Sequence, residues 1–385
     1  MKRALIFFAL NCLLLPIFAG EILIQEAFDS PESVEKYSSG VKMSFDKGEK
    51  GEGGALKMQT SENVHFGGLS LPVDARKLRG SVLELSGEMK GEKIAPGPKY
   101  YNGAKFMLVI DSPSGNIYGG SQMPTGNFGW KKVKLFIRVP YDATAGRLNL
   151  GFEESRGAIW IKNIKLEKTI TPVDLRASAN VGFVCGSKDG GDSGWFGAEP
   201  GEDASKFNYK QSSLFGNVPY SIIYPDSNKG KSALLLKPAD SKKAGAVSAK
   251  IRFAAPQNAK YLYVLNALET SASGQVGEIT ILGENGKSHA FKLQGGVDVA
   301  PWQNVKKDLK NAAVGAAWLA DKGWRRSNGL YSTRLEIPKD FGKIEYIDFG
   351  KASVGWMVVA ASLSDEKFPF PSENRFVSSE SKQWR

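Results

Sequence analysis

The stretch Trp130–Val139, WKKVKLFIRV, indicates the fold class more clearly than any other part of the chain. Its apolar side chains alternate at Val133, Leu135, Ile137 and Val139, and basic residues occupy most of the positions between them. A period of two is typical of a strand that buries one face and leaves the other in water, as in an antiparallel sheet. We therefore expect antiparallel β-structure here.

The strand that follows carries a change of parity. Its apolar positions are odd-numbered at Ile159 and Ile161 and even-numbered at Ile164 and Leu166. Such a switch turns the side chains to the opposite face of the sheet unless the strand absorbs one extra residue. The sequence therefore predicts a β-bulge near Lys162–Asn163.

The second half of the chain also has the pattern of an all-β protein. Ala259–Leu268 (AKYLYVLNAL) is apolar on both faces, as expected of a strand between a core and a covering layer. Asn285–Gly286, between the runs 278–282 and 288–293, is a dipeptide that tolerates the positive φ of a tight hairpin turn. Residues 305–320 have apolar side chains near helical spacing, so they are the one candidate helix.

The N-terminus has the pattern of a secretory signal peptide over residues 1–19. Lys2 and Arg3 form a basic head, an apolar run of signal-peptide length follows, and Ala19 supplies the small residue before the cleavage position. We therefore expect a secreted or periplasmic protein, and no other apolar run is long enough for a membrane span. Only Cys185 remains after processing, so no internal disulfide is expected.

The chain carries a formal net charge of +11 at pH 7. Lysines spread over solvent-facing strand positions explain much of this excess. A functional alternative is attraction to an acidic polymer, such as a glycan that carries uronate or sulfate groups. Nucleic acid is not an expected partner, because the protein is exported and no nucleic-acid-binding motif accompanies the charge.

These patterns predict an all-β protein of two tandem antiparallel jelly-roll β-sandwich domains after a cleaved signal peptide. The expected first domain covers residues 20–168 and the second covers residues 174–364. A linker is expected at 169–173 and a flexible tail at 365–385.

Each expected domain resembles a type of carbohydrate-binding module. In the first, Gly129–Trp130 enters an alternating strand and Gly157–Leu166 (GAIWIKNIKL) closes the domain, a pattern similar to jelly-roll modules of families four and nine. In the second, Asn180–Phe183, Gly190–Trp195 and Gly216–Pro225 are similar, in this order, to a second type of galactose-binding-like jelly-roll module. Modules of that second type are attached to secreted bacterial enzymes that degrade polysaccharides, so the resemblance implies sugar binding by both domains.

The resemblance of the first domain also implies a structural calcium ion between the N-terminal strand and the closing strand. It places Glu26 and Asp29 among the calcium ligands. Lys162 and Asn163 stand where those modules have acidic residues, and a lysine offers no oxygen to an ion that takes about six to eight of them. No other cofactor is expected.

Aromatic side chains in loops are the expected sugar-binding residues, because a flat ring stacks on the apolar face of a pyranose. The candidates lie in turn-rich or glycine-rich loops and are Tyr100, Tyr101 and Asn102 in the first domain and Trp195, Trp302, Trp324, Arg325 and Asn328 in the second. The alternative for each ring is burial beneath its own loop. Trp130 and Trp160 lie on strands and are expected in the core.

Residues for catalysis are not apparent in the sequence. His65 and His289 are the only histidines and lie in different expected domains, which disfavours a Ser-His-Asp site or a histidine-bound metal. We therefore expect a secreted, non-catalytic protein that binds polysaccharide through loop aromatics. Two alternatives remain open: the N-terminal targeting portion of a glycoside hydrolase, and a cell-surface structural or interaction protein that binds no sugar.

Overall fold

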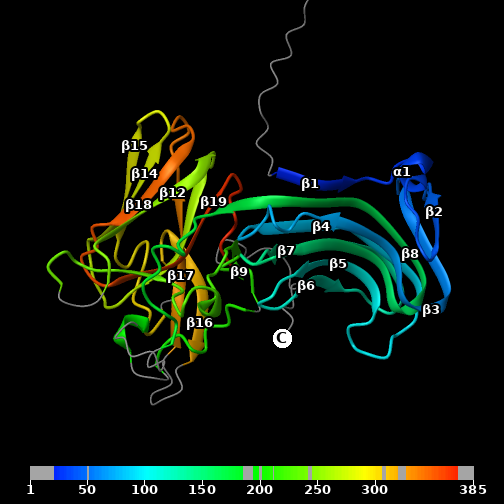
Figure 1. Ribbon diagram of the computed structural model, residues 1–385, viewed down its shortest axis with the longest axis horizontal. Coiled ribbons are helices and arrows are strands. Elements are labelled where there is room, and N and C mark those ends of the chain that lie inside the picture. Colours follow the sequence, from blue (N-terminus) through cyan, green and yellow to red (C-terminus); the bar gives the residue numbers. More distant parts are fainter. Residues whose placement is uncertain are drawn as a thin grey trace, which may run out of the picture.

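The computed structural model describes residues 21–49, 52–184, 194–198, 202–210, 212–241, 245–305, 309–319 and 327–371. This part of the chain consists almost wholly of antiparallel strands, and Figure 1 shows two β-rich domains side by side. The predicted all-β class and the antiparallel sandwiches are therefore confirmed. The expected signal peptide and Cys185 lie outside the described residues.

The first domain is organised around one long strand, β8. Its described elements are β1 (Glu21–Glu26), α1 (Pro31–Glu35), β2 (Lys42–Asp46), β3 (Ala55–Val73), β4 (Val82–Ile94), β5 (Gly103–Asp111), β6 (Ile117–Gln122), β7 (Gly126–Arg138) and β8 (Ala145–Pro172). One edge of β8 pairs with β3 and β1, and the other pairs first with β5 and then with β4. The sheet extends beyond β5 through β6 and beyond β4 through β7. The long strands β3 and β8 pair with each other along most of their length, so both run through the two layers of the sandwich.

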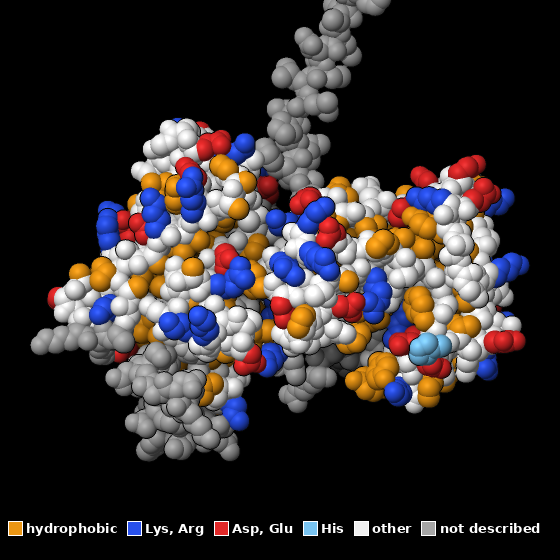
Figure 2. All heavy atoms as spheres, in the orientation of Figure 1, with side chains coloured by type: hydrophobic (Ala, Val, Ile, Leu, Met, Phe, Trp, Pro, Cys, Tyr) orange, Lys and Arg blue, Asp and Glu red, His pale blue; other side chains and the backbone are white. Residues whose placement is uncertain are grey.

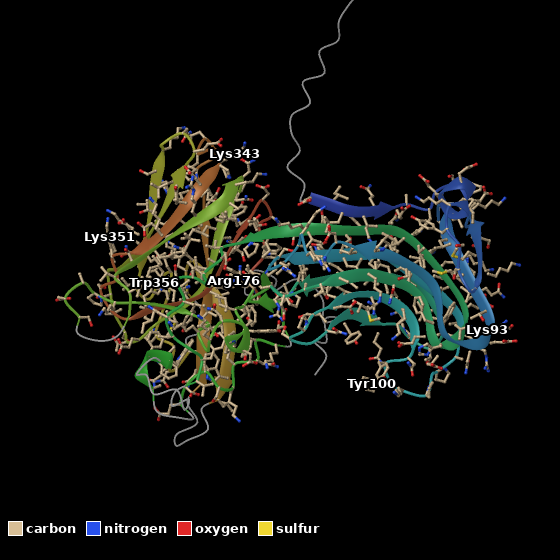
Figure 3. The ribbon with its side chains drawn as sticks, in the orientation of Figure 1. Lys93, Tyr100, Arg176, Lys343, Lys351 and Trp356 are labelled. Carbon is tan, nitrogen blue, oxygen red and sulfur yellow. The ribbon has the colours of Figure 1, made fainter. Side chains whose placement is uncertain are left out.

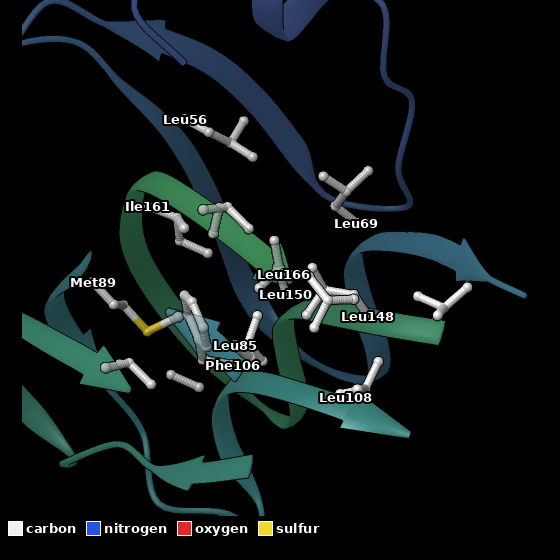
Figure 4. Packing of buried hydrophobic residues seen from close by; sticks show 14 of the residues in the cluster. Leu56, Leu69, Leu85, Met89, Phe106, Leu108, Leu148, Leu150, Ile161 and Leu166 are labelled. Carbon is white, nitrogen blue, oxygen red and sulfur yellow. The ribbon is translucent and has the colours of Figure 1, made fainter. Parts of the chain in front are cut away.

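Aliphatic and aromatic side chains fill the space between these two layers (Figure 4). Leu85 of β4, Phe106 of β5 and both Leu150 and Ile161 of β8 are fully buried there. Each buried side chain of this size stabilises the fold by about 1.5–3 kcal/mol relative to an exposed one. Because one face of each sheet packs on this core, the opposite face points toward solvent.

The predicted bulge is present in β8. Between the residues Lys162 and Lys165, β8 contains one residue more than its partner strand β4. Asn163 lies within this interval with a φ of 54°, a conformation that asparagine adopts more readily than most residues. As a result, Ile161 and Ile164 both face the core despite their odd separation.

The core of the second domain lies between two large sheets. The described elements of this domain are η1 (Trp195–Gly197), β9 (Leu214–Phe215), β10 (Val218–Pro219), η2 (Pro225–Ser227), β11 (Leu234–Leu236), β12 (Ser248–Gln257), β13 (Tyr261–Leu268), β14 (Gln275–Gly283), β15 (Ser288–Gln294), β16 (Ala312–Leu319), β17 (Ser327–Glu336), β18 (Ile344–Gly350) and β19 (Trp356–Ser364). One layer has the order β16-β17-β13-β19 and the other has the order β12-β18-β14-β15, and β9 and β10 form a separate two-stranded sheet. The predicted hairpin is confirmed, because Asn285–Gly286 joins β14 to β15 and Gly286 has a φ of 76°.

The central strands of the first of these layers are buried on both faces. Leu262 and Val264 of β13 pack into the core between the two sheets of the domain. Tyr263 and Leu265 point the other way, into a second hydrophobic cluster. The prediction that this strand lies between a core and a covering layer is therefore confirmed.

Residues 305–320 do not form the candidate helix in the part that the structure describes. Residues 312–319 form the strand β16, which pairs with β17 from Ala312↔Thr333 to Leu319↔Ser327. The pairing includes an irregularity between Val314 and Ala316. It lies in the alanine-rich segment whose apolar side chains are near helical spacing in the sequence. Strand pairing and burial thus override the local pattern.

The expected linker and flexible tail are also corrected. Residues 169–172 are the end of β8, and Thr171 pairs with Leu363 of β19. In the tail, residues 365–371 follow β19, and Phe368 and Phe370 are buried. Both segments are apolar enough to join the cluster beneath β13, so they pack instead of remaining in solvent. Residues 372–385 lie outside the described part of the chain.

The two domains are packed into one unit. Val82 and Ile170 of the first domain belong to the same hydrophobic cluster as Leu265 of the second. The Ser364 hydroxyl of β19 donates a hydrogen bond of 3.0 Å to the Thr169 carbonyl oxygen. A shared sheet and a shared hydrophobic cluster therefore join the domains.

Candidate functional site

A cleft of about 650 Å³ opens on the outer face of β5 and β6. It is lined by Tyr100, Tyr101, Lys105, Met107, Tyr118, Gly120, Ser121, Gln122 and Glu153. Its volume lies within the range of about 300–1,000 Å³ that is typical of ligand pockets. The lining combines aromatic rings with a few polar groups, which is the composition of a small-molecule or oligomer site.

The strand β6 supplies one wall and the floor of the cleft. Tyr118, Gly120 and Gln122 alternate along β6 and therefore share one face, opposite Met107 and Lys105 of β5. Tyr118 is 65% exposed. Gly120 keeps the floor open, because a Cβ at that position would lie 3.0 Å from the Met107 side chain.

The loop between β4 and β5 supplies the other wall, and Figure 3 shows Tyr100 at the edge of the first domain. Tyr100 and Tyr101 are 85% and 45% exposed, and their rings meet edge to face with centroids 5.3 Å apart. Gln122 of β6 donates a hydrogen bond of 2.7 Å to the Tyr100 carbonyl oxygen and so attaches the loop to the sheet. Asn102 accepts a hydrogen bond of 3.0 Å from the Lys99 amide, so its oxygen shapes the loop.

Two cations in and beside the cleft are paired with carboxylates, whereas Lys99 lies 5.6 Å from the centre of the Tyr101 ring. Lys105 is almost fully buried, and its ammonium nitrogen lies 2.5 Å from a Glu153 carboxylate oxygen. The same ammonium group lies 5.7 Å from the centre of the Tyr101 ring, which is within the range of a cation–π contact. Beyond the cleft on the same sheet, Arg147 of β8 forms an ion pair of 2.7 Å with Asp111. The aromatic walls therefore surround a floor of balanced charge.

The same face continues from β5 onto β8 and β3. Lys105 is paired with Gly151, which is paired with Gly68. These two glycines approach so closely that a Cβ on either would lie within about 2.2 Å of a carbonyl oxygen of the opposite strand. Next to them, the Ser70 hydroxyl donates a hydrogen bond of 2.9 Å to the Asn149 side chain. Beside the cleft, the sheet therefore has a low strip of backbone followed by small polar groups.

Among the candidates that the structure describes, it brings only those of the first domain to the surface. Tyr100 and Tyr101 are exposed as the binding hypothesis requires. Trp195 and Trp302, by contrast, are buried at 0% and 4% exposure, so the expectation that they bind sugar is wrong. They form an aromatic cluster that covers the second face of the β13 layer, with ring centroids 6.1 Å apart.

Of the remaining second-domain candidates, the structure describes Asn328. Asn328 is 1% exposed, and its amide donates a hydrogen bond of 3.1 Å to the Glu202 carbonyl oxygen, so its expected role in binding is also corrected. Trp324 and Arg325 lie outside the described residues.

The two tryptophans on strands of the first domain differ in burial. Trp160 is buried as predicted, whereas Trp130 is only partly buried. The Lys162 ammonium covers Trp130 and lies 4.1 Å from the centre of the Trp130 ring.

Tyr118 is the cleft residue that the sequence did not identify. It lies on a strand, where an aromatic ring is usually part of the core. The available signal was the segment Ile117–Gln122, in which two adjacent glycines follow the tyrosine. Such a segment has too little apolar side chain to bury Tyr118, so the ring stays exposed.

The residues near Glu26 do not fit a calcium ion. The Lys36 ammonium lies 2.9 Å from one Glu26 carboxylate oxygen, and the Tyr37 hydroxyl donates a hydrogen bond of 2.5 Å to the other. A calcium ion would have to displace both donors, and Asp29 alone cannot replace the missing oxygens. The structure shows no cluster of three or more potential metal ligands in the part of the chain it describes.

No protein-family model and no curated protein matches the chain. Its described helices include none long and apolar enough to cross a bilayer. Solved structures with some similarity include the CBM22-1 xylan-binding domain of Xyn10C from Paenibacillus barcinonensis, which is 17% identical with a TM-score of 0.30 and covers 39% of this chain and 96% of that one.

Two further solved structures have similar statistics. The CBM22-1–CBM22-2 tandem of the same Paenibacillus barcinonensis protein is 11% identical with a TM-score of 0.30, over 90% of this chain and 98% of that one. A family 11 carbohydrate-binding module of the Clostridium thermocellum cellulase Lic26A-Cel5E is 14% identical with a TM-score of 0.24, over 34% of this chain and 84% of that one. At these TM-scores the similarities do not establish a shared fold, and the families named are not families four and nine.

Proposed function

We propose that this protein binds polysaccharide in the cleft between β6 and the β4–β5 loop. The observation that carries the proposal is the exposure of Tyr100, Tyr101 and Tyr118, at 85%, 45% and 65%, around one cleft of about 650 Å³. Large aromatic rings rarely remain in water in such a group unless they serve a binding surface. Flat rings beside hydrogen-bonding groups suit the apolar faces and hydroxyls of sugars.

The expected affinity is modest for each sugar unit. A tyrosine ring that covers about 50 Å² of a pyranose face contributes on the order of 1 kcal/mol. Three rings in one cleft therefore favour a ligand with several sugar units over a monosaccharide. The low glycine strip at Gly68 and Gly151 extends the same sheet face and leaves room for a chain to continue.

The charge pattern of the cleft favours an uncharged polysaccharide. Lys105 is held by Glu153, and Arg147 is held by Asp111, so neither cation is free to pair with a uronate or sulfate group. The net charge of +11 is instead spread over other surfaces, and Figure 2 shows lysines and arginines scattered across both domains. We infer that the basic composition serves solubility or surface contacts and does not select the ligand.

The lining also favours binding over hydrolysis. Glu153 is the one carboxylate among the residues that line the cleft, and it forms an ion pair with Lys105. Glycosidases use two carboxyl groups on opposite sides of the scissile bond. The proposal is therefore a non-catalytic role, carried out outside the cytoplasm after removal of the expected signal peptide.

Affinity electrophoresis of the mature chain tests this proposal. We expect retardation in gels that contain a neutral β-linked or α-linked polysaccharide, with little change when the salt concentration is raised. The double variant Tyr100→Ala/Tyr118→Ala should lose the retardation. The matched control is Tyr346→Ala, which removes a tyrosine from a sheet face of the second domain and should behave as the unaltered chain.

Three outcomes would contradict the proposal or its ligand class. Normal mobility of the unaltered chain on a broad panel of neutral and acidic polysaccharides would favour the interaction-protein alternative. Retardation that survives the double variant would place the binding surface elsewhere. Retardation that disappears at high salt would indicate that the ligand is an acidic polymer and would contradict the neutral ligand class.

A further inference from the structure

A buried lysine lies beneath the loop that carries two of the cleft tyrosines. Lys105 of β5 is 8% exposed, although lysine is among the residue types that are least often buried. Its ammonium group donates a hydrogen bond of 2.5 Å to the Tyr101 carbonyl oxygen and lies 2.5 Å from a Glu153 carboxylate oxygen. The same group lies 5.7 Å from the centre of the Tyr101 ring. Lys105 therefore contacts both the backbone and the side chain of one cleft residue.

The pairing of β5 with β8 explains how Lys105 reaches these partners. Gly151 of β8 is directly opposite Lys105 and has no side chain, and Glu153 is the next residue on the same face of β8. Residues at such diagonal positions are about 7–8 Å apart, a distance that long side chains can span. The Glu153 carboxylate compensates the buried positive charge, so the ammonium group can remain charged while it holds the loop.

The other contacts of this loop do not fix Tyr101 against the floor of the cleft. Gln122 of β6 holds Tyr100 through a hydrogen bond of 2.7 Å to its carbonyl oxygen. Asn102 is held within the loop by hydrogen bonds to the residue three positions earlier. The contact between Tyr101 and the strand beneath it is made by Lys105.

A buried ion pair of this kind contributes little to the stability of a fold. The cost of removing two charges from water is similar to the attraction that they gain, and replacement of such a pair by neutral residues of similar volume is often without effect. A contact that holds one ring in one place has a different consequence. A preorganised ring has less conformational freedom to lose when a ligand binds, so the affinity is higher.

We propose that Lys105 is a positioning residue of the tyrosine cleft, which holds the Tyr101 ring toward the ligand with Glu153 as its counter-charge. It acts through Tyr101, and its effect is a gain in affinity for polysaccharide. This inference rests on the proposed sugar binding and adds a residue that determines how tightly the cleft binds.

The double variant Lys105→Met/Glu153→Gln tests the proposal without leaving an unpaired charge. Its affinity for an oligosaccharide cut from the polysaccharide that retards the unaltered chain should fall about tenfold in calorimetric titration, because the loop must be ordered during binding. Its unfolding temperature should stay within about 4 °C of that of the unaltered chain. Unchanged affinity, or a fall in affinity with a larger loss of stability, would overturn the proposal.

Amide hydrogen exchange supplies a readout that a purely structural role would not change. The Asn102 amide donates a hydrogen bond of 2.9 Å within the loop, so it should be protected in the unaltered chain without ligand. In the double variant it should exchange at least about tenfold faster while β5 and β8 keep their protection, and the oligosaccharide should restore the protection of the loop. Fast exchange in the unaltered chain, or faster exchange throughout β5 and β8 in the variant, would overturn the proposal.

Lys162→Met is the matched control. Lys162 is also a buried lysine, its ammonium group also donates a hydrogen bond to a backbone carbonyl oxygen, that of Glu52, and it lies 4.1 Å from the centre of the Trp130 ring. It is not among the residues that line the cleft. This variant should therefore keep both the affinity and the protection of the loop, and a tenfold loss of affinity in it would overturn the proposal.

The exchange experiment also separates this inference from the proposed function. If no polysaccharide retards the unaltered chain, the proposed function is contradicted, and the exchange of the Asn102 amide still decides whether Lys105 orders the loop. If the chain binds polysaccharide and the loop keeps its protection in the double variant, sugar binding stands and the positioning role of Lys105 is overturned.

Discussion

The two domains use loop aromatics in opposite ways. In the first domain, Tyr100 and Tyr101 lie in a loop beside a sheet whose other face already covers the core, and both rings remain exposed. In the second domain, Trp195 and Trp302 also lie in loops, yet both are buried in a cluster with Phe183, Phe207 and Trp318. Aromatic residues in connecting segments therefore form an exposed wall in one domain and part of a core in the other.

The difference arises from the sheet beneath each loop. The outer face of β5 carries Lys105, which is buried but paired with Glu153, and Met107, which is partly exposed, so this face needs no apolar cover. The β13 layer of the second domain is apolar on both faces, so one core cannot bury it. Its loops and the segment after β19 must supply a second core, and their aromatic rings do so.

The largest effect is expected from Trp195→Ala. The indole is fully buried, so its removal leaves a cavity and should lower the free energy of unfolding by about 3–5 kcal/mol. Urea titration of the whole chain measures this change. The affinity for polysaccharide should be unaltered below the unfolding transition. A stability loss below about 1 kcal/mol would show that the second-domain loops do not form a core.

Phe368→Ala should have the next largest effect. Its ring is 2% exposed and lies 6.2 Å from Phe136 of the first domain and 5.6 Å from Tyr263 of the second. We expect a loss of about 3 kcal/mol and, in calorimetry, a separation of one unfolding transition into two, because this ring contacts both domains. Phe66→Ala is the control, since Phe66 is 38% exposed and should change stability little. Equal behaviour of the two variants would contradict the shared core.

A smaller effect is expected from Tyr100→Ala. Its ring is 85% exposed, so stability should change by less than about 0.5 kcal/mol. Affinity for the retained polysaccharide should fall about fivefold, which corresponds to the roughly 1 kcal/mol of a stacked ring. Calorimetric titration with an oligosaccharide measures the affinity. A destabilised variant with unchanged affinity would show that Tyr100 has a structural role, like the buried rings of the second domain, and does not bind sugar.

The smallest effect is expected from Glu366→Gln at the junction of the domains. Burial, with smaller contributions from Glu84 and Glu167, raises the pKa of the Glu366 carboxyl. The folded chain thus binds a proton more tightly here than the unfolded chain, so this group lowers stability as the pH rises through its raised pKa. The variant should lack that loss, and its urea midpoint should exceed that of the unaltered chain more at about pH 8 than at about pH 4. The opposite trend would contradict this environment.

Local sequence patterns were sufficient for much of the fold. The period of two at Trp130–Val139 and the parity switch before Ile164 predicted a strand and a bulge that the structure contains. These features depend on neighbouring residues along one strand. The candidate helix at 305–320 was wrong because alanine spacing suits either structure, and pairing with β17 selects the strand.

The candidate site was less predictable because exposure is a tertiary property. The turn before Tyr100 and the glycines around Trp195 look alike in sequence, and only the sheet beneath them separates an exposed ring from a buried one. Tyr118 was missed because the absence of covering side chains around β6 depends on strand pairing. A pattern in which both faces of a strand are apolar, as at Ala259–Leu268, does signal that nearby loop aromatics will be used as cover.

The most direct test of the tyrosine cleft is a crystal structure of the chain with an oligosaccharide cut from the polysaccharide that it retains. We predict density for sugar rings against Tyr100 and Tyr118, with hydroxyl contacts to the β5–β6 floor. Sugar density confined to the second domain, with the cleft occupied by solvent, would contradict the assignment of binding to the exposed rings of the first.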